Sequence, residues 1–134
     1  MNLLHCMIVE DNPLNWMIMQ NQMHKLGLHP VIFHDGLAAL EYCRNHPLPH
    51  LILLDGYMPR MDGIAFLKEL RKLPTGDKPY VLFCSASPDK INIEEAMQEG
   101  ADCHFAKPLT QDQITFALRE TKARFDNLTA YKLA

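Results

Sequence analysis

Apolar residues gather along the chain in short, nearly continuous runs, and these runs predict the strands. Four runs come at similar spacing and a weaker fifth follows them, over residues 3–9, 31–33, 51–54, 80–84 and 103–106. Strands that are apolar along their whole length, rather than at alternate positions, are typical of parallel sheets buried on both faces. The pattern therefore predicts a parallel sheet covered by helices on both sides.

Turn-forming and capping residues between the runs mark where helices begin and end. The expected boundaries, in chain order, are Asn12-Pro13 to Gly27, Asp35-Gly36, Asp62-Gly63, Ser87-Pro88 to Gly100, and Thr110 with Gln113 as a capping box. Strands and helices therefore alternate in five units. This order predicts a doubly wound α/β domain over residues 1–125, with residues 126–134 as a short C-terminal tail.

Size and charge exclude several classes of protein. A chain of 134 residues can bury a core without disulfides or structural zinc, and its four cysteines, which show no C-x-x-C spacing, are expected to be buried thiols. With 13 basic and 16 acidic side chains, it lacks the basic excess of a nucleic-acid-binding protein. No apolar run approaches the ~20 residues of a membrane helix, and no signal-type segment follows Met1. We therefore expect a cytoplasmic protein that binds neither nucleic acid nor membrane directly.

Acidic residues, a hydroxyl and an amine follow the carboxyl ends of successive expected strands. Glu10 and Asp11 come after the first strand, Asp55 after the third, Ser85 after the fourth and Lys107 after the fifth. Each of these residues alone is typical of a solvated turn, but doubly wound sheets bind ligands at this edge. Clustered carboxylates repel one another unless a cation lies among them, and oxygen ligands without Cys or His favour magnesium. Together they predict a Mg²⁺ site beside groups that bind phosphoryl oxygens.

Three motifs make the sequence resemble the receiver domain of bacterial two-component response regulators. They are Val9-Glu10-Asp11-Asn12, Leu54-Asp55 with Met58-Pro59-Arg60-Met61-Asp62-Gly63, and Ala106-Lys107-Pro108. The resemblance covers almost the whole chain, and it implies a flavodoxin-like five-stranded parallel sheet in the order 2-1-3-4-5 with five helices. It also implies a signal transduction phosphoprotein that takes a phosphoryl group from a histidine kinase or histidine phosphotransfer protein and acts on a downstream protein.

The same resemblance implies a role for each residue of the site. Asp55 would be the phosphoacceptor, and Ser85 and Lys107 would bind the phosphoryl oxygens. Asp11, Asp55 and the backbone carbonyl of Tyr57 would ligate Mg²⁺, or Mn²⁺ in its place, and Glu10 would belong to the metal site by acting largely through water. Lys107-Pro108 resembles the cis peptide of the family.

His104, Tyr57 and Ser87 bear on switching and on the lifetime of the phosphoryl group. Ser85 and His104 are the expected switch positions, but His104 stands where the family usually has Tyr or Phe, which argues against an aromatic rotamer switch. The alternative role of His104 is to fill a half-buried strand position. The stretch His-Phe-Ala-Lys-Pro also resembles sporulation phosphorelay receivers, which favours a relay role. The bulky Tyr57 side chain can shield the phosphoryl group, and it has no amide or carboxylate that would orient a water molecule. Ser87 could hold a water molecule only weakly. We therefore expect slow self-dephosphorylation.

The first helix predicts an exposed apolar rim beside the site. At 100° per residue, one buried face comprises Met19, Met23 and Leu26, while Met17 projects to solvent and Leu14 and Trp16 flank the stripe. Such a rim suits a helical phosphotransfer partner, although scattered surface apolar residues are the alternative. The expected docking residues are Leu14, Trp16, Met17 and Pro108.

Several functions remain open on the sequence. A stand-alone receiver, either a relay intermediate or a regulator that acts by binding, is the leading interpretation, and a receiver excised from a hybrid histidine kinase or a longer response regulator is the alternative. An aspartate-dependent phosphatase would need a second Asp where Tyr57 stands, and a flavodoxin would need a Ser/Thr/Gly-rich loop after the first strand. The last alternative is a receiver-like domain that binds its partners without being phosphorylated. As in the family, we expect a monomer or a weak dimer through the fourth helix, fifth strand and fifth helix.

Overall fold

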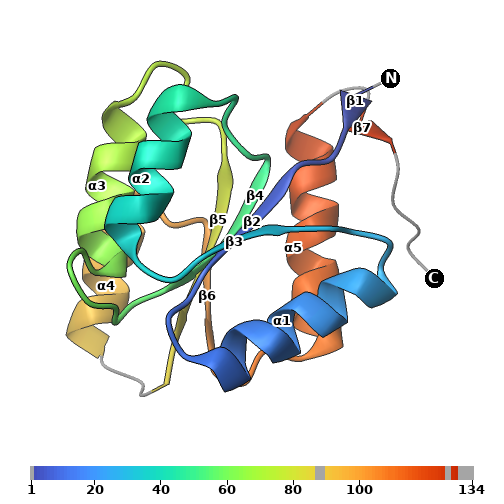
Figure 1. Cartoon of the computed structure of the whole chain (residues 1–134), viewed down its shortest axis with the longest axis horizontal. Coiled ribbons are helices and arrows are strands. Elements are labelled where there is room, and N and C mark those ends of the chain that lie inside the picture. The colour runs from blue at the N-terminus through green and yellow to red at the C-terminus, as the bar shows by residue number, and fades with distance from the viewer. Residues whose placement is uncertain (1, 87–89, 126–127, 130–134) are drawn as a thin grey trace.

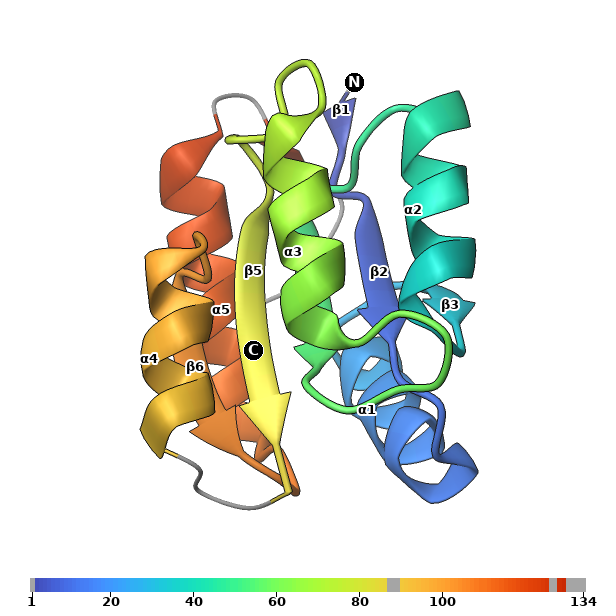
Figure 2. The ribbon, with the colours of Figure 1, turned by 90° about the vertical axis from the view of Figure 1, so that its left-hand side faces the viewer.

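The computed structural model describes residues 2–86, 90–125 and 128–129, and its main feature is a parallel sheet between two layers of helices (Figure 1). Helices α1 (Pro13–Lys25) and α5 (Gln111–Arg124) cover one face of this sheet. Helices α2 (Gly36–Asn45), α3 (Gly63–Lys72) and α4 (Lys90–Gln98) cover the other face, which is turned toward the viewer in Figure 2. This arrangement confirms the predicted doubly wound α/β class.

Five strands form the main sheet. They lie in the spatial order β3 (Val31–Phe33), β2 (Cys6–Val9), β4 (Leu51–Asp55), β5 (Tyr80–Ser85) and β6 (Cys103–Ala106), and all four pairings are parallel. Numbered along the chain within this sheet, the order is 2-1-3-4-5, as predicted. The chain moves from β2 to β3 on one side and then to β4 on the other, so the strand order reverses between β2 and β4. Ligands of such sheets bind beyond the carboxyl ends of the strands at this point.

Local side-chain hydrogen bonds explain where four of the helices begin. The N-cap residues, whose side chains accept hydrogen bonds from backbone N–H groups of the first turn, are Asn12, Asp35, Asp62 and Thr110. Gln113 completes the capping box by accepting from the backbone N–H of Thr110 at 3.0 Å. Each such cap contributes ~0.5–2 kcal/mol to helix stability, and all four were predicted from the sequence. Gly27 follows α1 with a φ of 79°, a left-handed conformation that glycine adopts without steric cost.

Burial along β4 shows how the core is divided between the two faces of the sheet. Leu51 and Leu53 pack toward α1 and α5, whereas Ile52 and Leu54 pack toward α2, α3 and α4. All four side chains are fully buried, which accounts for the continuous apolar run in the sequence. Among the described residues, the buried polar or charged ones are Glu10, Asp55, Ser85 and Thr121. Three of these four lie at the carboxyl edge of the sheet, where the functional site was expected.

The two ends of the chain differ from the prediction. The single strand expected over residues 3–9 is two strands, because β2 begins at Cys6 and a separate strand β1 covers Asn2–Leu3. β1 pairs in parallel with β7 (Leu128–Thr129), so a second, two-stranded sheet includes part of the stretch expected to be a tail. Strands of two residues carry no readable hydrophobic period, which is why the sequence did not predict them.

The bounds of the fourth helix and the burial of the cysteines can also be compared with the prediction. The predicted start of the fourth helix at Ser87-Pro88 lies outside the described residues, and α4 ends at Gln98, near the expected Gly100. Cys6, Cys43 and Cys84 are buried free thiols as predicted, whereas Cys103 is only half-buried, since it lies on the edge strand β6. Within the described ranges, no helix is both long enough and apolar enough to cross a membrane.

Candidate functional site

The register of the parallel strands brings the predicted site residues to one edge of the sheet. Val9 pairs with Leu54, so Glu10 and Asp11 follow β2 at the level where Asp55 ends β4. Ser85 pairs with Ala106, so Ser85 at the end of β5 lies level with the start of the segment that carries Lys107. The structure therefore gathers all five residues that the sequence placed after the strands.

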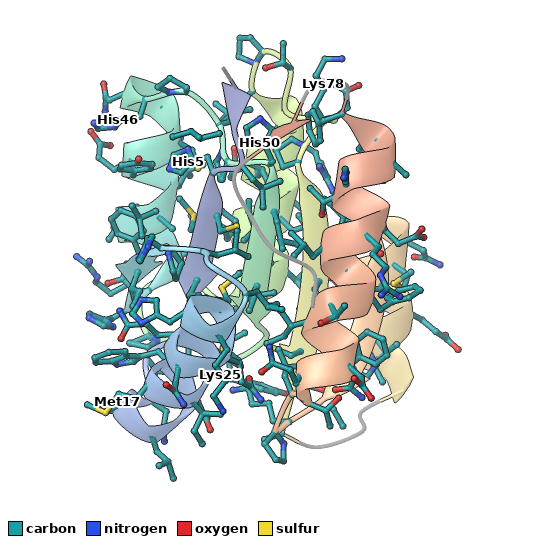
Figure 3. The ribbon with its side chains drawn as sticks, turned by 90° about the vertical axis from the view of Figure 1, so that its right-hand side faces the viewer. His5, Met17, Lys25, His46, His50 and Lys78 are labelled. Carbon is teal, nitrogen blue, oxygen red and sulfur yellow. The ribbon has the colours of Figure 1, made fainter. Side chains whose placement is uncertain are left out.

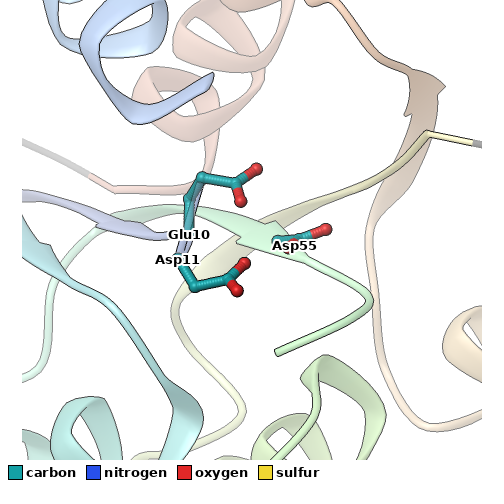
Figure 4. Close-up of side chains that lie close together, drawn as sticks. All are labelled: Glu10, Asp11 and Asp55. Carbon is teal, nitrogen blue, oxygen red and sulfur yellow. The ribbon is translucent and has the colours of Figure 1, made fainter. Parts of the chain in front are cut away.

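Three carboxylates form a compact acidic cluster at the strand-order reversal (Figure 4). One oxygen each from Glu10, Asp11 and Asp55 lies within 4.8 Å of the others. Glu10 and Asp55 are 0% and 3% exposed, whereas Asp11 is exposed. The cluster is therefore buried on the strand side and open to solvent on the side of Asp11, which gives a ligand a route to it.

Lys107 neutralises part of this acidic charge. Its Nζ lies 2.6 Å from Glu10 Oε1 and 2.7 Å from Asp55 Oδ1, and its side chain is only 10% exposed. Burial opposes the ammonium form, but the hydrogen bonds to Asp55 and Glu10 outweigh it and raise the pKa of Lys107. The ammonium form of Lys107 is therefore favoured, and its Nζ is directed at Asp55. The Lys107-Pro108 peptide that precedes α5 is cis, as the family resemblance implied.

Glu10 is the carboxylate whose charge is most affected by burial. Burial raises its pKa to about 7, although hydrogen bonds from Lys107 and from the Asn12 backbone N–H act in the opposite direction. The Asn12 N–H donates to Glu10 Oε2 at 3.1 Å, and Asn12 is itself the cap of α1. The start of α1 therefore fixes the orientation of Glu10. A buried carboxylate with so high a pKa is typical of a site that receives further positive charge.

Ser85 has a partner that the sequence did not predict. Its Oγ lies 3.0 Å from Nε2 of His104, and Ser85 is 3% exposed while His104 is half-buried. Burial lowers the pKa of His104 and so favours the neutral form of the ring. The register pairs Phe83 with His104 and Ser85 with Ala106, and this alternation places Ser85 and His104 on the same side of adjacent strands. The sequence carries only the alternation of sides within each strand as a signal for this contact, because the register between the two strands is set by the tertiary structure.

Tyr57 extends from the loop between β4 and α3 and is 59% exposed. Its hydroxyl accepts a hydrogen bond from the side-chain amide of Asn92 in α4 at 2.7 Å. Asn92 was not among the residues predicted from the sequence, because nothing in its neighbourhood along the chain points to this site. Ser87, the other residue expected to influence hydrolysis, lies outside the described residues.

The exposed rim on α1 is partly as predicted. Leu14 and Met17 are 69% and 53% exposed, and Met17 points outward from α1 at the end of the molecule away from His5 and His50 (Figure 3). Pro108 is also exposed. Trp16 differs from the expectation, because it is half-buried against the core and its ring lies 5.5 Å from the ring of His34. Leu14 and Met17 therefore make up most of the rim on this helix.

Comparison with known proteins agrees with this geometry. The family model of the response regulator receiver domain matches residues 6–119. The hybrid signal transduction protein dokA of Dictyostelium discoideum is 32% identical over 117 residues, which are 87% of this chain but 7% of dokA. The chemotaxis protein CheY of Bacillus subtilis is 30% identical over 116 residues, which are 86% of this chain and 94% of CheY.

A solved structure gives the same answer for the fold. The receiver domain of the sensor histidine kinase PA1611 from Pseudomonas aeruginosa, determined with a magnesium ion in its active-site cleft, superimposes with a TM-score of 0.80. The two chains are 24% identical, and the match covers 88% of this chain and 96% of that domain. Fold, strand order, site geometry and family match agree, and the chain belongs to the response regulator receiver domain family.

Proposed function

We propose that this receiver accepts a phosphoryl group from a phosphohistidine partner onto Asp55, in a Mg²⁺-dependent reaction, and thereby switches the binding of a protein target or relays the phosphate. One observation carries the proposal: Lys107 contacts Asp55 at 2.7 Å inside a cluster of three carboxylates at the strand-order reversal. A nucleophilic carboxylate, a fixed cation and a set of oxygen ligands are the groups that phosphoryl transfer to an aspartate requires.

The residues present suit a magnesium ion. Carboxylate oxygens are the ligands that Mg²⁺ prefers, and Glu10, Asp11 and Asp55 offer them within 4.8 Å of one another. The backbone carbonyl of Tyr57 is the further proposed protein ligand, and Glu10 is proposed to act largely through water. When bound, the ion neutralises negative charge on the oxygens of the incoming phosphoryl group.

The side chains of the chain itself account for the transfer step. One oxygen of the Asp55 carboxylate bonds to phosphorus while the bond from phosphorus to the donor histidine nitrogen breaks, and that electron pair stays on the imidazole. Lys107 stabilises the charge that spreads over the phosphoryl oxygens. The protein catalyses only its own phosphorylation and slow dephosphorylation, and in this sense it is a signalling domain rather than an enzyme.

Ser85 and His104 are the proposed switch. A serine hydroxyl has one hydrogen to donate and two lone pairs to accept. If His104 carries its hydrogen on Nε2, it donates to Ser85 Oγ and leaves the hydroxyl hydrogen free for a phosphoryl oxygen. Charge-assisted bonds from Ser85 and Lys107, at ~1.5–3 kcal/mol each, together approach the ~5.5 kcal/mol that moves a population from 1:99 to 99:1. Phosphorylation can therefore shift most of the population through these contacts.

The test of this function is the intact mass after incubation with acetyl phosphate and Mg²⁺, with and without a chelator. We expect one added phosphoryl group with Mg²⁺ and none in the chelator, because without the metal the acidic cluster repels the incoming anion. Addition that is equal in chelator would contradict the magnesium requirement. If acetyl phosphate adds nothing, incubation with phosphorylated histidine kinases and histidine phosphotransfer proteins is the decisive assay, and no transfer from any of them would refute the phosphoacceptor role.

The proposed partner surface is the exposed rim of α1 with Pro108, on which a helical phosphotransfer partner would dock. We expect Met17→Glu to slow phosphotransfer from the cognate partner by about tenfold, because a charge in the centre of an apolar contact costs ~1 kcal/mol or more. Labelling of Asp55 by acetyl phosphate is the internal reference, since it needs no docking. Met97, also an exposed methionine at 41%, lies on α4, and Met97→Glu is the matched control. Equal transfer rates for the two variants would refute the docking surface.

Three further proposals concern the bounds of the domain, its compartment and its oligomeric state. We propose that residues 1–125 form the receiver unit, that it works in the cytoplasm, and that it is a monomer or a weak dimer through α4, β6 and α5. Whether it acts alone or as part of a hybrid kinase or longer regulator is decided by the reading frame of its gene, since its relatives include both kinds of protein. Tyr57, in place of a second aspartate, disfavours the phosphatase alternative.

A further inference from the structure

A hydrogen bond joins the loop after β4 to the first turn of α4. The Asn92 side-chain amide donates from Nδ2 to the Tyr57 hydroxyl oxygen at 2.7 Å. Tyr57 follows Asp55 by two residues, and the whole of β5 separates it from Asn92 along the chain. The bond is therefore a tertiary contact that holds the Tyr57 side chain toward α4 instead of leaving it free in solvent.

Tyr57 and Asn92 both line a small cavity beside the site. The cavity has a volume of about 50 Å³, and Gly56, Phe83 and Ser85 are among its other lining residues. A water molecule needs only ~10–15 Å³ of such volume, so the cavity has room for water. Ser85, the proposed ligand of a phosphoryl oxygen, is in its wall. Gly56, the residue after Asp55, is in the wall as well, so water in the cavity would lie beside a phosphoryl group on Asp55, and the Tyr57–Asn92 pair forms part of the boundary.

We propose that Asn92 is a positioning residue that holds the Tyr57 ring across this cavity and so slows hydrolysis of phosphorylated Asp55. The inference rests on the proposed phosphoacceptor function. In the hydrolysis step, the oxygen of a water molecule bonds to phosphorus as the bond from phosphorus to the Asp55 oxygen breaks. The electron pair returns to the carboxylate, and inorganic phosphate leaves with both hydrogens of the water. In this proposal Asn92 touches none of the reacting atoms and acts through Tyr57.

The strength of the bond sets the size of the effect. A hydrogen bond between neutral groups that water can also reach changes an equilibrium by about two- to tenfold. Tyr57 is more than half exposed, so its hydroxyl would exchange Asn92 for water once the amide is removed. The ring would then spend correspondingly more time away from the cavity. Loss of either partner should therefore raise the hydrolysis rate by about two- to tenfold.

The experiment measures decay of the phosphoryl group in the full chain. Wild type, Tyr57→Phe, Asn92→Ala and the double variant are phosphorylated with acetyl phosphate and Mg²⁺, the donor is removed, and intact mass is followed with time. We expect both single variants to decay about two- to tenfold faster than wild type. The double variant should decay no faster than the faster single variant, because both changes remove the same bond. Asn45→Ala, an exposed asparagine at the far end of α2, is the matched control and should decay at the wild-type rate.

Several decay rates would overturn the role proposed for Asn92. Wild-type decay in Tyr57→Phe overturns the inference by itself, even if Asn92→Ala does not fold, because that variant keeps the ring and loses only the hydroxyl. Rate increases that multiply in the double variant also overturn it, since the two residues would then act independently. Faster decay in Asn45→Ala as well would overturn the inference, because loss of any asparagine side chain would then accelerate hydrolysis. Failure of wild type to accept a phosphoryl group from acetyl phosphate or from any phosphohistidine donor refutes the proposed function, and this inference with it.

Discussion

Replacement of Asp55 by asparagine is expected to abolish phosphoryl incorporation completely. The amide keeps the size of the side chain but has no anionic oxygen that could bond to phosphorus, and it removes one of three carboxylates from the cluster. We expect intact mass to show no addition in Asp55→Asn after incubation with acetyl phosphate and Mg²⁺, where wild type gains one phosphoryl group.

The matched control is Asp112→Asn, an exposed aspartate in the first turn of α5 and outside the acidic cluster. It should gain one phosphoryl group like wild type. Incorporation in Asp55→Asn equal to that of the control would place the acceptor at another residue, which fragment masses of the phosphorylated chain would identify.

Replacement of Lys107 by methionine is expected to destabilise the metal-free fold by about 3 kcal/mol at neutral pH. Methionine keeps an unbranched apolar stem, but the change leaves the buried carboxylates of Glu10 and Asp55 without their shared cation. The pKa of Glu10 is already raised to about 7 by burial, and loss of Lys107 raises it further. A raised carboxylate pKa means that the folded state favours the protonated form, so the part of the destabilisation that comes from Glu10 should shrink as the pH falls from the higher pKa of the variant toward 7, below which Glu10 is protonated in wild type as well.

Urea unfolding of wild type and variant, in chelator and in Mg²⁺, measures this effect. Mg²⁺ should restore part of the lost free energy of unfolding, because a dication can take over the role of the ammonium group. The control is Lys68→Met, since Lys68 pairs with Glu95 at 3.6 Å and both side chains are over 40% exposed. Such a surface pair is worth ~0–1 kcal/mol. A loss in Lys107→Met no larger than in Lys68→Met would mean that the buried lysine does not stabilise the acidic cluster.

The sequence predicted most of the fold because the relevant signals are local. Asn12, Asp35, Asp62 and Thr110 each bond to backbone N–H groups two or three residues ahead, and such a bond forms wherever the chain begins a helix. The fully apolar run of β4 likewise reports burial on both faces of a sheet without reference to any partner. The core of the site followed from the same logic, because parallel strands all end at one edge of their sheet.

Contacts between distant elements were decided only by the tertiary structure. The hydrogen bonds of Ser85 to His104 and of Tyr57 to Asn92, the half-burial of Trp16 and the pairing of β1 with β7 were not predicted. Each depends on how two elements approach to within a few ångströms, and a shift of one residue in register or a small rotation of a helix would remove it. Sequence alone thus determined which residues meet at the acidic site, because chain direction and strand ends place them there. The tertiary structure determined which neighbours surround them, because side-chain hydrogen bonds depend on distances that no local pattern specifies.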